Sequence, residues 1–156
     1  MNGFILAAIL FNVIAFTTSK RLTKNQIVHI WMFTIVAQML FDGYIDHKYQ
    51  AYWYFDIEIS WYDFLPVTIL VPPVNMIFLN WFPFGSTLLR KFVYFLGWWV
   101  AIVIYEVIAL LPAPWGYFHY GWWNLWYSII MDPFLLLLIL GYYKWIRKIE
   151  KETLYT

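Results

Sequence analysis

The chain has 156 residues, of which 63% are hydrophobic, 24% are aromatic and only 12% are charged. Soluble domains have about half apolar and a quarter charged residues, so this composition predicts an integral membrane protein. The formal net charge of +1 gives no support for a strongly charged partner. The absence of cysteine excludes disulfides, thiolate metal sites and thiol nucleophiles.

Five segments are long and apolar enough to cross a membrane, which requires about 20 mainly apolar residues. The first has no positively charged leader and no cleavage site, so we expect it to be retained. The third contains Pro66, Pro72 and Pro73. We find no linker or repeat, and predict that residues 1–156 form one all-α transmembrane domain. Its predicted helices are residues 2–18, 25–44, 61–81, 92–111 and 122–143.

Basic residues are distributed asymmetrically between the predicted connections. The connections after the first and third helices and the C-terminal tail hold nine of the ten, whereas Lys48 alone lies on the other side with five acidic residues. Cytoplasmic loops retain Lys and Arg, so we predict an outside N-terminus and a cytoplasmic C-terminus. We also expect the nine residues to bind anionic lipid headgroups. They are Lys20, Arg21, Lys24, Arg90, Lys91, Lys144, Arg147, Lys148 and Lys151.

Aromatic residues concentrate in the two connections on the predicted outer side. Residues 49–64 and 115–127 hold 16 of the 38 aromatic rings. Tyr and Trp favour the headgroup level, so one interpretation is an interfacial belt. The alternative is that these connections fold back as a lid over an outward-facing cavity, because the first is long for a mere connection.

Polar residues lie deep within several predicted helices. At about 1.5 Å per residue, Asp132, Gln38 and Asn12 all fall near the bilayer centre, with Glu106 nearer the outer surface. A charge at the centre costs about 3 kcal/mol or more, so Asp132 should face the bundle. No basic residue lies inside a predicted helix, and burial without a counter-charge favours the neutral acid, which is a hydrogen-bond donor.

Prolines in these helices leave backbone carbonyl groups without their usual N–H partner, and these carbonyls could accept hydrogen bonds from Asp132 and the other polar side chains. Pro133 removes the backbone bond to the carbonyl of Ile129, and Pro72 with Pro73 releases those of Thr68 and Ile69. Carbonyls freed within a membrane must find other partners. We therefore hypothesise a buried polar network of Asp132, Gln38, Asn12 and Asn75 with the interrupted third helix.

Two roles are open for these polar residues. Hydrogen bonds between them could simply join the helices. Alternatively, Asp132 and its neighbours could form a proton or ion relay, or a polar binding pocket reached from outside past Glu106. Glu106 is the preferred active group in that case, because it lies closer to water.

The sequence gives little support for a metal site, a phosphate-binding site or a catalytic nucleophile. Asp42 and Asp46 are four residues apart and precede His47, so they come nearest to a site for a hard cation. A solvated acidic helix end is the simpler interpretation. There is no metal-ligand spacing among the histidines, no phosphate-binding glycine loop and no nucleophile motif. We expect no metal, no cofactor, no enzymatic activity and no nucleic-acid partner.

Four stretches carry a resemblance to a known family. They are KNQIVHIWMFTIVAQMLFD, NMIFLNWFPFGSTLLRK, VAIVIYEVIAL and GWWNLWYSIIMDPF. Together they resemble a family of small five-span hypothetical proteins from endospore-forming bacteria, which implies a five-span topology and no particular activity. NWFPFG, Lys91 and Glu106 resemble the VanZ-like envelope proteins more weakly. Asn80 lies closer to Pro83 than that pattern requires, and the usual glutamine after the glutamate is absent.

These observations favour a small cell-membrane protein with a structural or accessory role, associating with itself or with a larger membrane complex. The alternative is a module that binds or transports an ion or small molecule through a polar pocket around Glu106. A pocket that reaches Glu106 would favour the second function, and a solidly packed bundle would favour the first.

Overall fold

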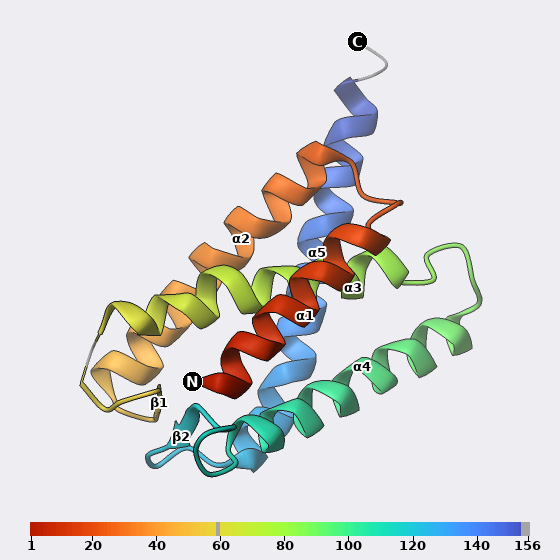
Figure 1. The fold of residues 1–156 in the computed structure, drawn as a ribbon. Helices are drawn as coiled ribbons and strands as arrows, with labels where there is room; N and C mark the ends of the chain where they lie inside the picture. The colour runs from red at the N-terminus through yellow and green to blue at the C-terminus, as the bar shows by residue number, and fades with distance from the viewer. Residues whose placement is uncertain (59, 154–156) are drawn as a thin grey trace.

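The computed structural model describes residues 1–58 and 60–153, except for the side chains of Asp46, His47 and Thr153. Five α-helices and one small sheet form this part of the chain, as Figure 1 shows. They are α1 (Asn2–Thr18), α2 (Lys24–Asp42), β1 (Tyr52–Tyr54), α3 (Val71–Trp81), α4 (Leu88–Ala109), β2 (Phe118–Tyr120) and α5 (Leu125–Thr153). α3 packs against α1 and α2, and α5 packs against α2 and α4.

The helices agree with the class predicted from composition. Four stretches are long and apolar enough to cross a membrane, whereas α1, with 17 residues, is apolar but shorter. The chain is mostly helical, and the largest difference from the predicted helices is at the end of α5. This helix continues from residue 143, where we placed its end, to Thr153, so the basic tail is helical. The four stretches are Lys24–Ile45, Trp61–Trp81, Leu88–Ala109 and Leu125–Glu152.

The third helical stretch accommodates its prolines by changing its hydrogen bonding. A 3-10 turn at Trp61–Asp63 leads into a π-helical segment, Pro66–Leu70, and then into α3. Pro72 and Pro73 lie in the first turn of α3. Proline is tolerated there because an N–H at this position has no partner within an α-helix. The interrupted helix predicted over residues 61–81 is therefore confirmed.

Aromatic and aliphatic side chains of α3 form the centre of the core. Met76 and Phe78 are completely buried, and the ring of Phe78 contacts the rings of Tyr94 and Trp98 on α4. In contrast to α3, α4 has few buried side chains. Only Ala109 is buried, and apolar side chains are exposed all along the helix. A helix that is apolar on all sides suits a lipid environment.

Polar side chains fasten the end of the bundle that carries the basic connections. The buried amide of Asn80 donates to the carbonyl of Thr18 at 2.7 Å and accepts from the backbone N–H of Arg21 at 3.0 Å. Glu150 near the end of α5 accepts hydrogen bonds from Asn25 at 2.8 Å and Gln26 at 2.5 Å. These contacts hold the α1–α2 connection against α3 and α5.

The two aromatic connections pair with each other at the opposite end of the bundle (Figure 1). β1 and β2 are antiparallel, with Trp53 opposite His119. The backbone N–H groups of Gly121 and Trp123 both donate to the carbonyl of Ala51. A side chain at residue 121 would collide with the carbonyl of Gln50, so the close approach of the two connections requires glycine there.

Some aromatic rings of these connections are buried, as predicted for a lid, and others are exposed, as predicted for an interfacial belt. Tyr52, Tyr117 and Trp123 are at most 9% exposed, so they form part of a lid and not of a surface belt. Trp61 and Trp126 are 87% and 73% exposed, as expected of rings at an interface. We name the segment of β1, β2 and Trp123 the aromatic lid.

Candidate functional site

Two adjoining cavities lie beneath the aromatic lid. The smaller, of about 180 Å³, lies among α2, the third helical stretch, α4, α5 and the lid, and we name it the carboxylate cavity. The larger, of about 460 Å³, extends from it between the same helices and α1 and is lined mainly by apolar side chains, so we name it the apolar cavity. Both are lined by Gln38, Phe41, Leu70, Val71, Ile102, Tyr105, Asp132 and Leu135.

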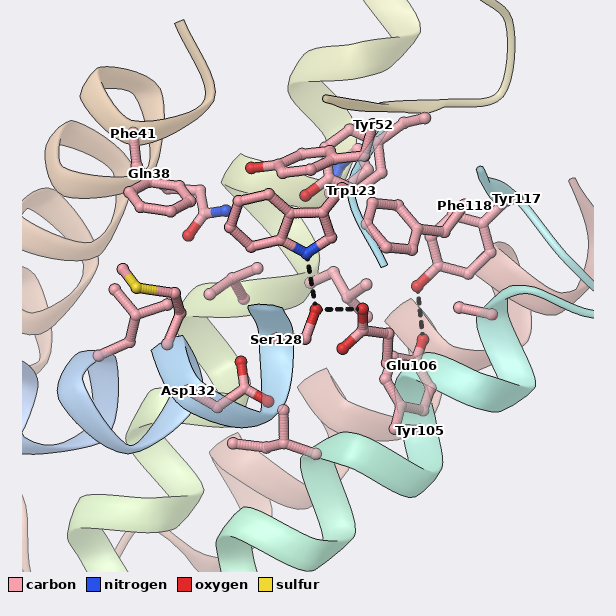
Figure 2. A pocket seen from close by; sticks show the side chains of 18 residues that line it. Gln38, Phe41, Tyr52, Tyr105, Glu106, Tyr117, Phe118, Trp123, Ser128 and Asp132 are labelled. Carbon is pink, nitrogen blue, oxygen red and sulfur yellow. Dashed lines mark hydrogen bonds between the residues drawn. The ribbon is translucent and has the colours of Figure 1, made fainter. Parts of the chain in front are cut away.

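Glu106 on α4 lies at the lid end of the carboxylate cavity. Its Oε1 accepts hydrogen bonds from the hydroxyl groups of Tyr120 and Ser128, each at 2.5 Å. Figure 2 shows that the series of hydrogen bonds extends to Trp123, whose indole N–H donates to the hydroxyl of Ser128 at 2.9 Å. Burial and the neighbouring Glu106 carboxylate raise the pKa of the Tyr120 hydroxyl, which keeps it a donor. One carboxylate oxygen thus joins α4, β2 and α5.

Asp132 lies one turn after Ser128 on α5 and lines both cavities. Figure 2 shows its carboxyl group on the same side of α5 as Ser128. Its Oδ2 is buried and makes no hydrogen bond within the described part of the chain. We expected Asp132 to donate to the carbonyls that proline releases. The carbonyl of Ile129 instead accepts a hydrogen bond from the indole N–H of Trp99, at 3.1 Å.

Gln38 and Asp42 form a separate group at the edge of the carboxylate cavity. The amide of Gln38 donates to both oxygens of Asp42, at 3.0 and 3.3 Å, and the hydroxyl of Tyr52 donates to Asp42 at 2.6 Å. Asp42 is only 4% exposed. The interpretation of Asp42 as a solvated helix end was therefore wrong, because the aromatic lid covers it.

The possible cation site of Asp42 with Asp46 and His47 depends on two side chains that lie outside the described residues. Among the side chains that are described, no group of three or more His, Asp and Glu residues could hold a metal ion.

Asn12 and Asn75 make hydrogen bonds away from the carboxylate cavity. The amide of Asn12 donates to the carbonyl of Ile69 at 2.7 Å, one of the acceptors that we expected proline to release. Asn75 on α3 donates to the hydroxyl of Thr34 on α2 at 3.0 Å and lines the apolar cavity. Both side chains act as connections between helices.

The five residues singled out from the sequence are therefore spread over different contacts. Glu106, Asp132 and Gln38 line one cavity, Asn75 lines the adjoining one, and Asn12 lines neither. Within the described chain no hydrogen bond joins any two of the five, in contrast to the single network that we hypothesised.

Ser128, Tyr120 and Trp123 were not predicted as residues of the site, and Asp42 was considered only for a cation site with Asp46 and His47. Ser128 precedes Asp132 by four residues and Asp42 follows Gln38 by four, a spacing that places each pair on one helical face. That spacing was the available signal. Nothing in the sequence distinguished Tyr120 or Trp123 from the other rings of the aromatic connections, because their roles depend on the pairing of β1 with β2.

The fold and the site define a helical protein with four stretches long and apolar enough to cross a membrane and with a cavity under an aromatic lid. No protein-family model matches the chain, and no curated protein or solved structure matches it.

Proposed function

We propose that the chain is a multi-pass protein of the cell membrane that binds a small molecule in the carboxylate cavity. All five α-helices cross the bilayer, with the N-terminus and the aromatic lid outside and the C-terminus in the cytoplasm. The positions of the nine basic residues support this orientation. They lie in the α1–α2 connection and at the first residue of α2, at the start of α4 and in the last part of α5, away from the lid (Figure 1).

The observation that carries the proposal is the cavity that reaches Glu106. A bundle whose only task is to hold its helices together would fill this space with side chains, because protein interiors are close-packed. Instead, Glu106 and Asp132 line a cavity that adjoins the apolar cavity. A concave, mainly apolar site with a few convergent polar groups is typical of small-molecule binding. We propose binding or transport without a chemical reaction.

A structural role is the second candidate, and one observation favours it. Glu106 accepts two hydrogen bonds from residues of two other elements, Tyr120 and Ser128. Such bonds join elements in a membrane bundle whether or not a ligand enters the cavity. The two candidates differ in whether the cavity is accessible from the lid side.

Cysteine accessibility tests the proposed function, because the chain contains no cysteine. Ala109 lines the carboxylate cavity and is 4% exposed, whereas Ala15 is 1% exposed in the core and lines neither cavity. The Ala109→Cys and Ala15→Cys variants are reconstituted in liposomes. A small, membrane-impermeant thiosulfonate reagent is then added to the outside, and labelling is measured by mass spectrometry.

We expect the Ala109→Cys thiol to be labelled at least about tenfold faster than the Ala15→Cys thiol. Circular dichroism and gel filtration verify that both variants are folded. Equal resistance of both thiols in folded protein would contradict the binding function and leave the structural role as the better explanation.

A further inference from the structure

We propose that the ligand of the carboxylate cavity is an organic cation, an ammonium group with alkyl substituents attached to an apolar body. This inference rests on the proposed function and specifies the chemical class of the ligand. It is carried by three properties of the two cavities, which are the charges of their linings, the aromatic side chains around Glu106 and the adjoining apolar volume.

The charge of the lining selects against anions. Glu106 and Asp132 are the two acidic residues that line the carboxylate cavity, and no Lys, Arg or His is among the described lining residues of either cavity. Opposite charges attract more strongly in this partly dehydrated environment than in water. Asp132 also has a buried oxygen without a hydrogen-bond partner in the described chain, so it is an acceptor that a ligand can satisfy.

The aromatic side chains favour an alkylated ammonium over a metal ion. Seven of the 18 residues that line the carboxylate cavity are aromatic. Ring faces attract cations, and alkylated ammonium groups are recognised by sites rich in aromatic side chains. Hard metal cations instead require about six or more oxygen ligands, whereas Oε1 of Glu106 is already engaged by Tyr120 and Ser128. The seven are Phe41, Tyr52, Tyr54, Tyr105, Tyr117, Phe118 and Trp123.

The apolar cavity provides room for the rest of the ligand. It begins at the shared residues Leu70, Ile102 and Leu135 and is the larger of the two, at about 460 Å³. Burying an alkyl or aryl group there contributes about 25 cal/mol per Å² of apolar surface removed from water. An amphipathic cation can therefore occupy both cavities at once, with its ammonium group between Glu106 and Asp132 and its apolar body in the apolar cavity.

Matched probes separate charge from shape in the test. Choline and 3,3-dimethylbutan-1-ol have nearly the same shape, but only choline is charged. Benzyltrimethylammonium adds an apolar group, and phosphocholine adds the phosphate of a lipid headgroup. Binding to the purified full chain in a neutral maltoside detergent is measured by isothermal titration calorimetry and by tryptophan fluorescence.

We expect choline to bind at least about tenfold more tightly than its uncharged isostere, and benzyltrimethylammonium more tightly than choline. Phosphocholine should bind more weakly than choline, because its phosphate would meet the carboxylates. Stronger binding of phosphocholine than of choline would overturn the free cation in favour of a lipid headgroup.

Charge-removing variants complete the test. Glu106→Gln should raise the Kd of choline by about tenfold, because it removes one negative charge and keeps the shape. Asp132→Asn should raise the Kd as well, because a cation bound beside Asp132 favours its ionised form, which the amide cannot adopt. Glu152→Gln is the matched control, since Glu152 is 65% exposed on α5 and lines neither cavity, and it should leave the Kd unchanged.

Equal binding of choline and its isostere, unchanged affinity in both carboxamide variants, or no binding of any cation to folded protein would each overturn the proposal. Rapid labelling of the Ala109→Cys thiol together with no cation binding would refute the ligand class and leave the binding function intact.

Discussion

The indole N–H of Trp99 on α4 donates a hydrogen bond to the backbone carbonyl of Ile129 on α5, with 3.1 Å between nitrogen and oxygen. This carbonyl has no α-helical partner, because residue 133 is proline and carries no N–H. A side chain of a neighbouring helix thus satisfies the acceptor that Pro133 releases. The Asp132 carboxyl group remains directed at the cavity.

The first prediction concerns this contact between α4 and α5. Trp99→Phe removes the N–H and keeps an aromatic ring, so it should lower the free energy of unfolding by about 1 kcal/mol. Unfolding is measured by titration with SDS and followed by circular dichroism. Trp126→Phe is the control, because Trp126 is 73% exposed on α5, and it should change stability by less than about 0.5 kcal/mol.

A double-mutant cycle identifies the cause of that loss. In a Pro133→Ala background, residue 133 regains an N–H that can bond the carbonyl of Ile129, so Trp99→Phe should have little further effect. The same cost in both backgrounds would show that the ring of Trp99 stabilises the protein through packing and not through this hydrogen bond.

The sequence predicts the position of a residue along its helix much better than its position around the helix axis. Runs of apolar residues located the helices, and the proline positions identified Ile69 and Ile129 as free acceptors. The donor to Ile69 was also among the predicted residues, because Asn12 is polar in an apolar helix. The donor to Ile129 was not, because α4 is apolar on all sides and its sequence does not show which way Trp99 points.

The candidate site was predictable only in part for the same reason. Glu106 and Asp132 stand out as acids within apolar helices, but their common cavity depends on the rotation of α4 and α5. Asp42 was misinterpreted because its neighbour Tyr52 belongs to a connection that folds back over the helices. Pairing between β1 and β2 is non-local, and short aromatic segments carry no signal for their register.

The second prediction separates the charge of Glu106 from its hydrogen bonds. Glu106→Gln keeps an oxygen that can accept from Tyr120 and Ser128, so its unfolding free energy should change by less than about 1 kcal/mol. Glu106→Leu leaves both hydroxyl groups without this acceptor and should destabilise the fold by about 2 to 3 kcal/mol. The two variants are compared by thermal unfolding in detergent. Similar stability of both would mean that the hydrogen bonds to Glu106 contribute little.

The third prediction tests the aromatic lid. Trp53 and His119 are paired across β1 and β2, and their rings lie 6.0 Å apart. The Trp53→Cys/His119→Cys variant should therefore form an intramolecular disulfide on mild oxidation, because directly paired positions hold the Cβ atoms about 4.5 to 5.5 Å apart and a small movement of the strands reaches the roughly 4 Å that a disulfide needs. The shift in a non-reducing gel after protease cleavage between the two positions measures the cross-link.

An offset pair controls for chance collisions between the two connections. Ile57→Cys/His119→Cys places one thiol four residues beyond the paired position, outside β1. It should cross-link at least about tenfold more slowly. Equal rates for the two pairs would refute the register, and with it the closed lid over the carboxylate cavity.

The last prediction concerns the other end of the bundle, where Glu150 joins α5 to the start of α2. Its carboxylate accepts hydrogen bonds from Thr23, Asn25 and Gln26. Gln26 is buried, and its amide would lose an acceptor in Glu150→Ala, so we expect a loss of about 1 kcal/mol in unfolding free energy. Hydrogen exchange in the first turn of α2 should become faster. Glu152→Ala, which removes an exposed carboxylate 3.8 Å from Lys148, should leave both measurements nearly unchanged. The opposite ranking of the two variants would mean that the helical tail of α5 does not hold α2 in place.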